Sequence, residues 1–312
     1  MRRKLTDYLL VTLKGVGMGA ADVVPGVSGG TIAFISGIYE ELINSIKSIN
    51  FSSLKQLFKN GIKDFWISIN GNFLLAVFVG ILISVFSLAR ILKYILDNNP
   101  VLIWSFFFGL IIASAIFVSK KAVKWNFSIL LTLIIGGIVA YFVTIITPTE
   151  TTDAYWFIFL SGALAICAMI LPGISGAFIL LLLGKYKFIL GAIIEVKMDI
   201  IMTLGCGAII GLLVFSNLLS WLLKKYHNLT IALLSGFMLG SLNKVWPWKI
   251  TASAFTNING KIKPLVEKNV LPDTYFEFSH KDPQLFYCVL LAIAGFFIIF
   301  FVEKFFNKSK TV

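Results

Sequence analysis

The sequence predicts an all-α polytopic membrane protein built from two inverted repeats of about five apolar segments each. Three observations lead to this prediction. Of the 312 residues, 58% are hydrophobic and only 13% are charged, whereas a soluble domain has about a quarter charged residues. Several uncharged stretches approach or exceed the roughly 20 residues that cross a bilayer. A Pro-Gly-(Val/Ile)-Ser-Gly peptide also occurs twice, in DVVPGVSGGT at 22–31 and in MILPGISGAF at 169–178.

Ten apolar segments follow from this pattern, separated by turn signals such as Asp97-Asn98-Asn99-Pro100 and Thr147-Pro148-Thr149-Glu150. The first five span 5–22, 29–46, 73–96, 100–119 and 126–147. The second five span 155–171, 175–194, 199–223, 229–243 and 284–304. We therefore expect one integral membrane domain over 1–312, with a first repeat at 1–150 and a second at 151–312.

The two halves align with each other at two offsets. An offset of 147 pairs identical residues around the repeated peptide, namely Gly15 with Gly162, Ser28 with Ser175, Gly37 with Gly184 and Tyr39 with Tyr186. An offset of 127 pairs Gly109 with Gly236 and Ser114 with Ser241. The difference between the two offsets is explained by a polar stretch at 47–72 that only the first half has. Its sequence FSSLKQLFKNGIKDFW predicts an amphipathic helix at the membrane surface, with lysines on the polar face.

The number of crossings in each half determines how the halves are oriented. The first two segments of each half are either two full spans or a re-entrant hairpin with the repeated peptide at its tip. Each half then crosses the membrane five times in the first case and three times in the second. Because both numbers are odd, the second half is inverted relative to the first. Inverted repeats with broken helices near the midplane are typical of secondary transporters.

The distribution of lysine and arginine predicts that both termini are cytoplasmic. The basic residues gather in stretches that this topology places in the cytoplasm: 2–4, 47–63, 120–124, 224–225 and 304–310. The opposite stretches 97–100 and 148–154 have none, and the exception is an external loop at 244–283 with six lysines. Since flanking lysines account for the net charge of +12, we expect a membrane partner and no nucleic acid.

The repeated peptide has the chemistry of an anion site. Pro-Gly ends one helix and Ser-Gly begins the next, where Ser28 or Ser175 suits the N-cap. Free N–H groups and the helix dipole at such a terminus attract phosphate or carboxylate. The alternative is a pair of tight turns between ordinary helices. The candidate substrate-binding residues are Pro25, Gly26, Ser28, Gly29, Gly30 and Thr31 in the first copy, and Pro172, Gly173, Ser175 and Gly176 in the second.

Ionisable side chains inside a membrane are costly and usually functional. Asp22 adjoins the first copy, and we expect Asp22 and Glu40 to couple transport to ion or proton binding. Arg90 and Lys185 are further candidates for substrate contact. Alternatively, Arg90 lies at a helix end leaving the membrane and Lys185 extends to the interface. No pattern in the sequence predicts a metal site, and we expect no cofactor.

Three stretches resemble a bacterial membrane family that was formerly a domain of unknown function and is now associated with polyprenyl-phosphate translocases called PopT. They are KGVGMGAADVVPGVSGGTIAFISGIYEELI at 14–43, LPGISGAFILLLLGKY at 171–186 and LLSGFMLGS at 233–241. The resemblance covers essentially the whole chain. It implies a multi-pass protein of the bacterial cytoplasmic membrane, not an enzyme, that recycles undecaprenyl phosphate from the outer to the inner leaflet. The second copy differs, because Met169, Ala177 and Phe178 stand where the first has Asp22, Gly30 and Thr31.

Two other functions fit parts of the sequence. A small-anion secondary transporter would use the same inverted repeats and helix termini, and only the family resemblance favours a lipid over it. A membrane enzyme acting on polyprenyl phosphate or pyrophosphate needs clustered catalytic side chains. The two histidines, His227 and His280, fall in loops predicted on opposite sides, which counts against a histidine phosphatase. The sequence is compatible with an oligomer.

Overall fold

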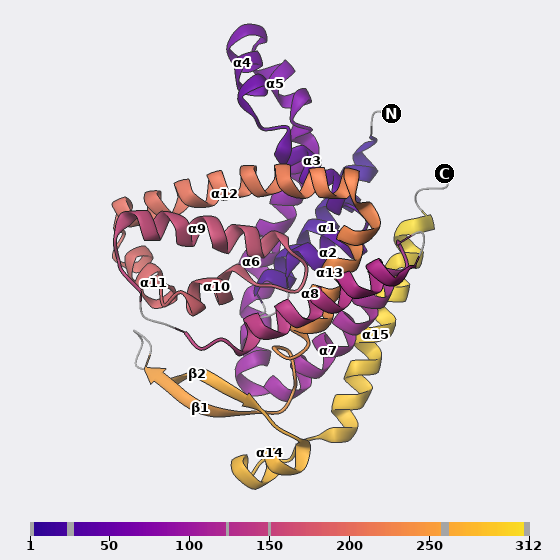
Figure 1. Cartoon of the computed structure of the whole chain (residues 1–312), viewed down its shortest axis with the longest axis vertical. Coiled ribbons are helices and arrows are strands. Elements are labelled where there is room, and N and C mark those ends of the chain that lie inside the picture. The colour runs from indigo at the N-terminus through magenta and orange to yellow at the C-terminus, as the bar shows by residue number, and fades with distance from the viewer. Residues whose placement is uncertain (1–2, 24–27, 123–124, 149–150, 257–261, 309–312) are drawn as a thin grey trace.

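The computed structural model describes residues 3–23, 28–122, 125–148, 151–256 and 262–308, and these are almost entirely helical (Figure 1). The first half contains α1 (Leu5–Val23), α2 (Gly29–Ile35), α3 (Tyr39–Lys47), α4 (Phe51–Asn60), α5 (Ile62–Ser68), α6 (Gly71–Asn98), α7 (Pro100–Ser119) and α8 (Phe127–Ile145). The second half contains α9 (Tyr155–Ile170), α10 (Gly176–Leu182), α11 (Tyr186–Ile194), α12 (Met198–Lys225), α13 (His227–Ser241), β1 (Lys249–Thr256), β2 (Ile262–Asn269), α14 (Pro272–Ser279) and α15 (Leu285–Lys308).

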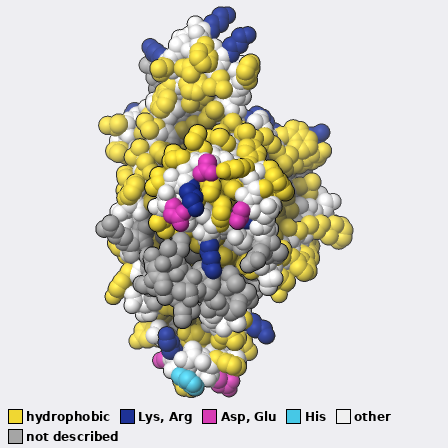
Figure 2. Space-filling model, turned by 90° about the vertical axis from the view of Figure 1, so that its left-hand side faces the viewer, with side chains coloured by type: hydrophobic (Ala, Val, Ile, Leu, Met, Phe, Trp, Pro, Cys, Tyr) yellow, Lys and Arg dark blue, Asp and Glu magenta, His cyan; other side chains and the backbone are white. Residues whose placement is uncertain are grey.

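The helices confirm an α-helical polytopic membrane protein. Within the described residues, four helices are long and apolar enough to cross a bilayer, namely α6, α7, α8 and α12. The pair α10 and α11 passes the same test together but is bent by 110°. Large hydrophobic side chains cover much of the upper part of the face seen in Figure 2, around a central group of charged side chains, and lysines of α4 and α5 lie at its upper end. Such a surface fits contact with lipid and would be unusual on a soluble protein.

Helix lengths and packing follow the two offsets found in the sequence. Helices α2 and α10 have seven residues each, α3 and α11 have nine, and α6 and α12 have 28. The packing is equivalent as well, because α1 packs on α6 as α9 packs on α12, and α7 packs on α15 as α13 packs on α8. The two halves therefore share one design at the level of structure.

Two predicted segments, 29–46 and 175–194, are each broken into two helices. The breaks fall at Gly37 and Gly184, with φ of 74° and 67°, a left-handed conformation that suits glycine. At both breaks the N–H after the glycine donates to the carbonyl five residues earlier, at 3.0 Å in the first half and 2.8 Å in the second. This bond closes the end of the preceding helix. The sequence pattern did not indicate either break.

The first hairpin leaves and returns to the same end of the molecule. Arg3, just before α1, donates to both carboxylate oxygens of Glu41 in α3 at 2.5 Å. Asn70, the N-cap residue of α6, donates to the same carboxylate at 2.9 Å. Since the starts of α1 and α6 meet at α3, the chain between them is re-entrant. In the first half, the described helices long and apolar enough to cross a membrane are α6, α7 and α8.

The second hairpin is also re-entrant, but from the opposite end. The Tyr155 hydroxyl donates to the Asp199 carboxylate at 2.7 Å, which joins the starts of α9 and α12. The far end of α12 reaches α3, where Ser220 donates to Asn44 at 2.9 Å. A helix of 28 residues is about 42 Å long, so α9 begins far from the start of α1. In Figure 1 the start of α9 lies at the left of the view, away from both termini at the upper right, while the β1–β2 hairpin and α14 lie in the lower part.

The two polar insertions differ from their predictions. The stretch 47–72 contains two helices rather than one, because Gly61 adopts a φ of 89° between α4 and α5. The loop 244–283 contains an antiparallel two-stranded sheet, in which Lys249 pairs with Asn269, followed by α14. The sequence pattern did not indicate these strands. They belong to the end of the molecule from which the second hairpin enters.

Candidate substrate site

The structure brings the two copies of the repeated peptide together inside the protein. The Ser28 hydroxyl lies 2.9 Å from the carbonyl oxygen of Met169 and 3.0 Å from that of Leu171. The Gly173 N–H donates to the Thr31 hydroxyl at 3.2 Å. Each bond joins the tip of one hairpin to the tip of the other. The tips are therefore in direct contact, although their sequences are more than 130 residues apart.

Close backbone contact explains the glycine at position 30. A Cβ atom there would lie 2.3 Å from the carbonyl oxygen of Ile170, at the end of α9. The adjacent Tyr39 hydroxyl donates to the same carbonyl at 3.3 Å. In the second copy the aligned residue is Ala177, which is exposed. Packing between the hairpins, rather than the motif alone, thus requires glycine in the first copy.

The N-terminus of α2 already holds an anion, the carboxylate of Asp22. The Gly29 N–H donates to Asp22 Oδ1 at 2.7 Å. The Gly30 N–H donates to the Ser28 hydroxyl at 3.1 Å, which confirms Ser28 as the N-cap. A carboxylate at this place is stabilised by free N–H groups and by the helix dipole. The protein's own side chain therefore occupies the terminus that the sequence assigned to substrate.

The second copy lacks this internal anion. Met169 stands in place of Asp22, and Ser175 occupies the N-cap position of α10 without a side-chain capping bond. Ser175 therefore has the predicted N-cap position, but among the described residues its hydroxyl makes no capping hydrogen bond. Pro172, Gly173 and Gly176 are buried beside it. The two termini are chemically different, as their sequences indicated.

The remaining candidates lie away from the hairpin tips or outside the description. The Lys185 ammonium is 2% exposed and contacts the Asp153 carboxylate and the Thr151 carbonyl, just before α9. The Glu40 carboxylate is 57% exposed and lies 3.3 Å from His227 Nε2. Neither side chain reaches the tips. Pro25 and Gly26 lie outside the described residues, and so does the side chain of Arg90.

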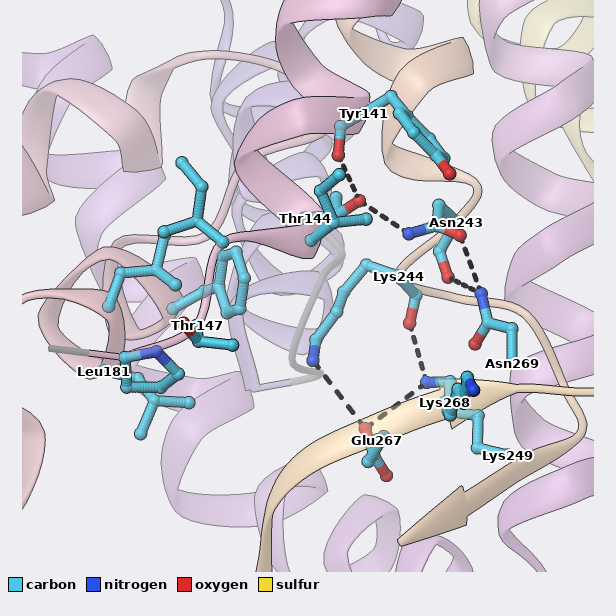
Figure 3. Close-up of a pocket in the computed structure, with 15 residues that line it drawn as sticks. Tyr141, Thr144, Thr147, Leu181, Asn243, Lys244, Lys249, Glu267, Lys268 and Asn269 are labelled. Atoms are coloured by element: carbon cyan, nitrogen blue, oxygen red, sulfur yellow. Dashed lines mark hydrogen bonds and ion pairs between the residues drawn. The ribbon is translucent and has the colours of Figure 1, made fainter. Parts of the chain in front are cut away.

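A pocket of about 390 Å³, which the sequence did not suggest, adjoins the second hairpin (Figure 3). It lies between α8, α10, the residues after α13 and the two strands. Its charged lining residues are Lys244, Lys249, Glu267 and Lys268. Glu267 lies 3.7 Å from the Lys244 ammonium and 3.8 Å from that of Lys249. We call this feature the lysine pocket. The only sequence signal was the excess of lysine in a loop predicted to be external.

The equivalent place in the first half is filled by side chains. Leu182 of α10 lines the lysine pocket, and its counterpart at the offset of 147 is Ile35 of α2. Ile35 is 5% exposed and belongs to a buried cluster with Leu110 and Ala113 of α7 and Ile299 of α15. The second hairpin is therefore open to a pocket at Leu182, whereas the first is tightly packed at Ile35. Among the residues that the structure describes, no group of three or more His, Cys, Asp or Glu could hold a metal ion.

Hairpins that enter from opposite ends and meet inside a helical bundle are an arrangement found in many membrane transporters. A model of the VCA0040-like family, described as undecaprenyl phosphate translocase-like, matches residues 18–263, and the chain belongs to this family. The resemblance noted in the sequence is thereby confirmed.

Two relatives have names that describe a function. The chain is 45% identical over 308 residues to a polyprenyl-phosphate transporter of Vibrio cholerae, and the alignment covers 99% of this chain and 100% of the relative. It is 34% identical over 256 residues to a polyprenyl-phosphate transporter of Staphylococcus aureus, over 75% of this chain and 85% of the relative. No solved structure matches the chain.

Proposed function

We propose that the protein transports polyprenyl phosphate, and undecaprenyl phosphate in particular, from the outer to the inner leaflet of the bacterial cytoplasmic membrane. Both termini are cytoplasmic in this proposal, and the protein is a transporter without catalytic activity. One observation carries the proposal: two inverted hairpins place their tips in contact, through Ser28 with Met169 and Leu171. The names of the two relatives support the choice of substrate.

The headgroup binds where the hairpin tips meet, in this proposal, and Asp22 regulates access to the site. The Asp22 carboxylate accepts the Gly29 N–H, so it competes with a phosphate for the same donor. Protonation of Asp22 removes its negative charge and frees the terminus for the substrate anion. At the second tip, Ser175 and the N–H groups that follow it contribute without an internal competitor. Binding of phosphate and of a proton would thus be linked.

The test is leaflet-resolved transport by the purified protein in liposomes. We expect movement of a fluorescent polyprenyl phosphate between leaflets and no accumulation of inorganic phosphate inside the vesicles. Protein-free liposomes are the control. Uptake of inorganic phosphate without lipid movement would instead identify a small-anion transporter. Release of phosphate from the lipid would identify an enzyme.

A further inference from the structure

We propose that the lysine pocket is the place where the phosphate monoester headgroup of the lipid first binds, at the end of the molecule opposite the termini. This inference rests on the proposed function and adds a second binding site to it. The pocket is separate from the hairpin tips, but it shares a helix with one of them. Phe178, which lines the pocket, is the third residue of α10, the helix that begins at the second repeated peptide.

The charge of the pocket matches a phosphate monoester. Lys244, Lys249 and Lys268 line it together with a single acid, Glu267, so its described lining has a net charge of about two positive. A phosphate monoester has about −1.5 to −2 charges at neutral pH. Figure 3 shows the Lys244 and Lys249 ammonium groups turned toward the Glu267 carboxylate. Glu267 thus holds the position between two cations that a phosphate would take.

The cations are held in place before any ligand arrives. The Lys249 side chain is 7% exposed, donates to the Lys244 carbonyl at 2.7 Å and lies 4.1 Å from the centre of the Trp104 ring. Polar side chains that line the pocket are also linked by hydrogen bonds. Asn269 donates to Asn243 at 2.8 Å, and Asn243 donates to Thr144 at 2.7 Å. Ordered donors reduce the entropy lost on binding.

The wall formed by α10 is apolar, and this favours a phosphorylated lipid over free phosphate. Phe178, Leu181 and Leu182 of α10 line this wall, and the Lys244 ammonium lies 4.9 Å from the centre of the Phe178 ring. Ile145 and Ile146, at the end of α8, also line the pocket and are about half exposed. The surface of α8 beyond them is apolar and exposed, so a polyprenyl tail can remain in hydrocarbon while its headgroup lies among the lysines.

The proposal is tested with substitutions that remove either a positive or a negative charge from the pocket. The measurement is equilibrium binding of geranylgeranyl phosphate to the purified protein in detergent. Lys244→Gln should weaken binding roughly tenfold, because it removes a charge-assisted contact. Lys244→Arg should restore binding. Glu267→Gln should strengthen binding several-fold, because it removes the competing anion. Lys281→Gln, a surface lysine at the same end but outside the pocket, is the matched control and should bind as wild type.

Two comparisons make the result decisive. Geranylgeraniol and inorganic phosphate should each bind at least tenfold more weakly than geranylgeranyl phosphate. Equal binding of inorganic phosphate would overturn the lipid assignment, and equal binding by Lys244→Gln, Glu267→Gln and wild type would overturn the site. Only folded variants, with wild-type elution on gel filtration, are compared, and Lys268→Gln provides a second variant with a smaller structural role. Liposome transport by the wild type is measured separately, so a failure of the proposed function is recognised independently.

Discussion

Gly30→Ala perturbs the contact between the two hairpin tips with a single methyl group. The added Cβ would lie 2.3 Å from the Ile170 carbonyl oxygen, so the two hairpins must separate by about 1 Å. Overpacking of this kind costs about 1–3 kcal/mol. A matched control is Gly205→Ala in α12, whose Cβ meets nothing within 4 Å. Both variants gain up to about 1 kcal/mol of helix propensity, so only the clash distinguishes them.

We therefore expect Gly30→Ala to be less stable than Gly205→Ala by about 1–3 kcal/mol. The measurement is the unfolding midpoint of both proteins in one detergent, followed by intrinsic fluorescence, together with liposome transport. Transport should fall in Gly30→Ala and remain at the wild-type level in Gly205→Ala. Equal stability and equal transport of the two variants would show that the tips do not pack as described.

Three further predictions concern individual side chains. Ser28→Ala should lower the free energy of unfolding by about 1–2 kcal/mol, because a cap and two carbonyl contacts are lost. Ser175→Ala should lower it by less than about 0.5 kcal/mol but should still impair transport. Equal losses of stability in denaturant unfolding would contradict this difference. Asp22→Asn should bind substrate but lose the pH dependence of liposome transport, and an unchanged pH profile would exclude proton coupling through Asp22. Burial lowers the pKa of Lys249 to about 8, against the opposing charge of Glu267, so the Lys249 charge is present below pH 8 and lost above it. Binding of geranylgeranyl phosphate should accordingly weaken between pH 7 and 9 in wild type and remain constant in Lys249→Arg, and a constant wild-type affinity would contradict the assignment.

The sequence predicted the membrane segments well because their signals are local. Apolar runs and turn residues placed the start of α6 at 73 and the start of α9 at 155, and the structure has them at Gly71 and Tyr155. The breaks at Gly37 and Gly184 were missed, because a left-handed turn between two apolar runs changes neither composition nor charge. The two strands were missed because they lie within a stretch, 244–283, whose many charged residues indicated only an external loop.

The chemistry of the site depended on contacts that no local pattern contains. The sequence placed Asp22 beside the first repeated peptide and indicated a role in coupling, but only the fold shows the carboxylate accepting the Gly29 N–H. Lys185 was a candidate substrate contact until the fold paired it with Asp153, 32 residues away. The lysine pocket combines α8, α10 and a β-hairpin. Such combinations follow from tertiary packing, which one sequence does not reveal.

Access to equivalent positions on the two hairpins distinguishes alternating access from a static bundle. Cysteines are introduced singly at Leu182 and at Ile35, in a background from which Cys167, Cys206 and Cys288 have been replaced, and both are treated with a membrane-impermeant maleimide from either side. In substrate-free protein, Leu182→Cys should react from the side that the proposed orientation makes external, because Leu182 lines the lysine pocket. Ile35→Cys should be protected from both sides by Ile299 and its neighbours. Added polyprenyl phosphate should make Ile35→Cys reactive from the cytoplasmic side while Leu182→Cys becomes protected. Reaction of both cysteines from one side, or labelling that substrate does not change, would contradict the inverted arrangement and the transport mechanism based on it.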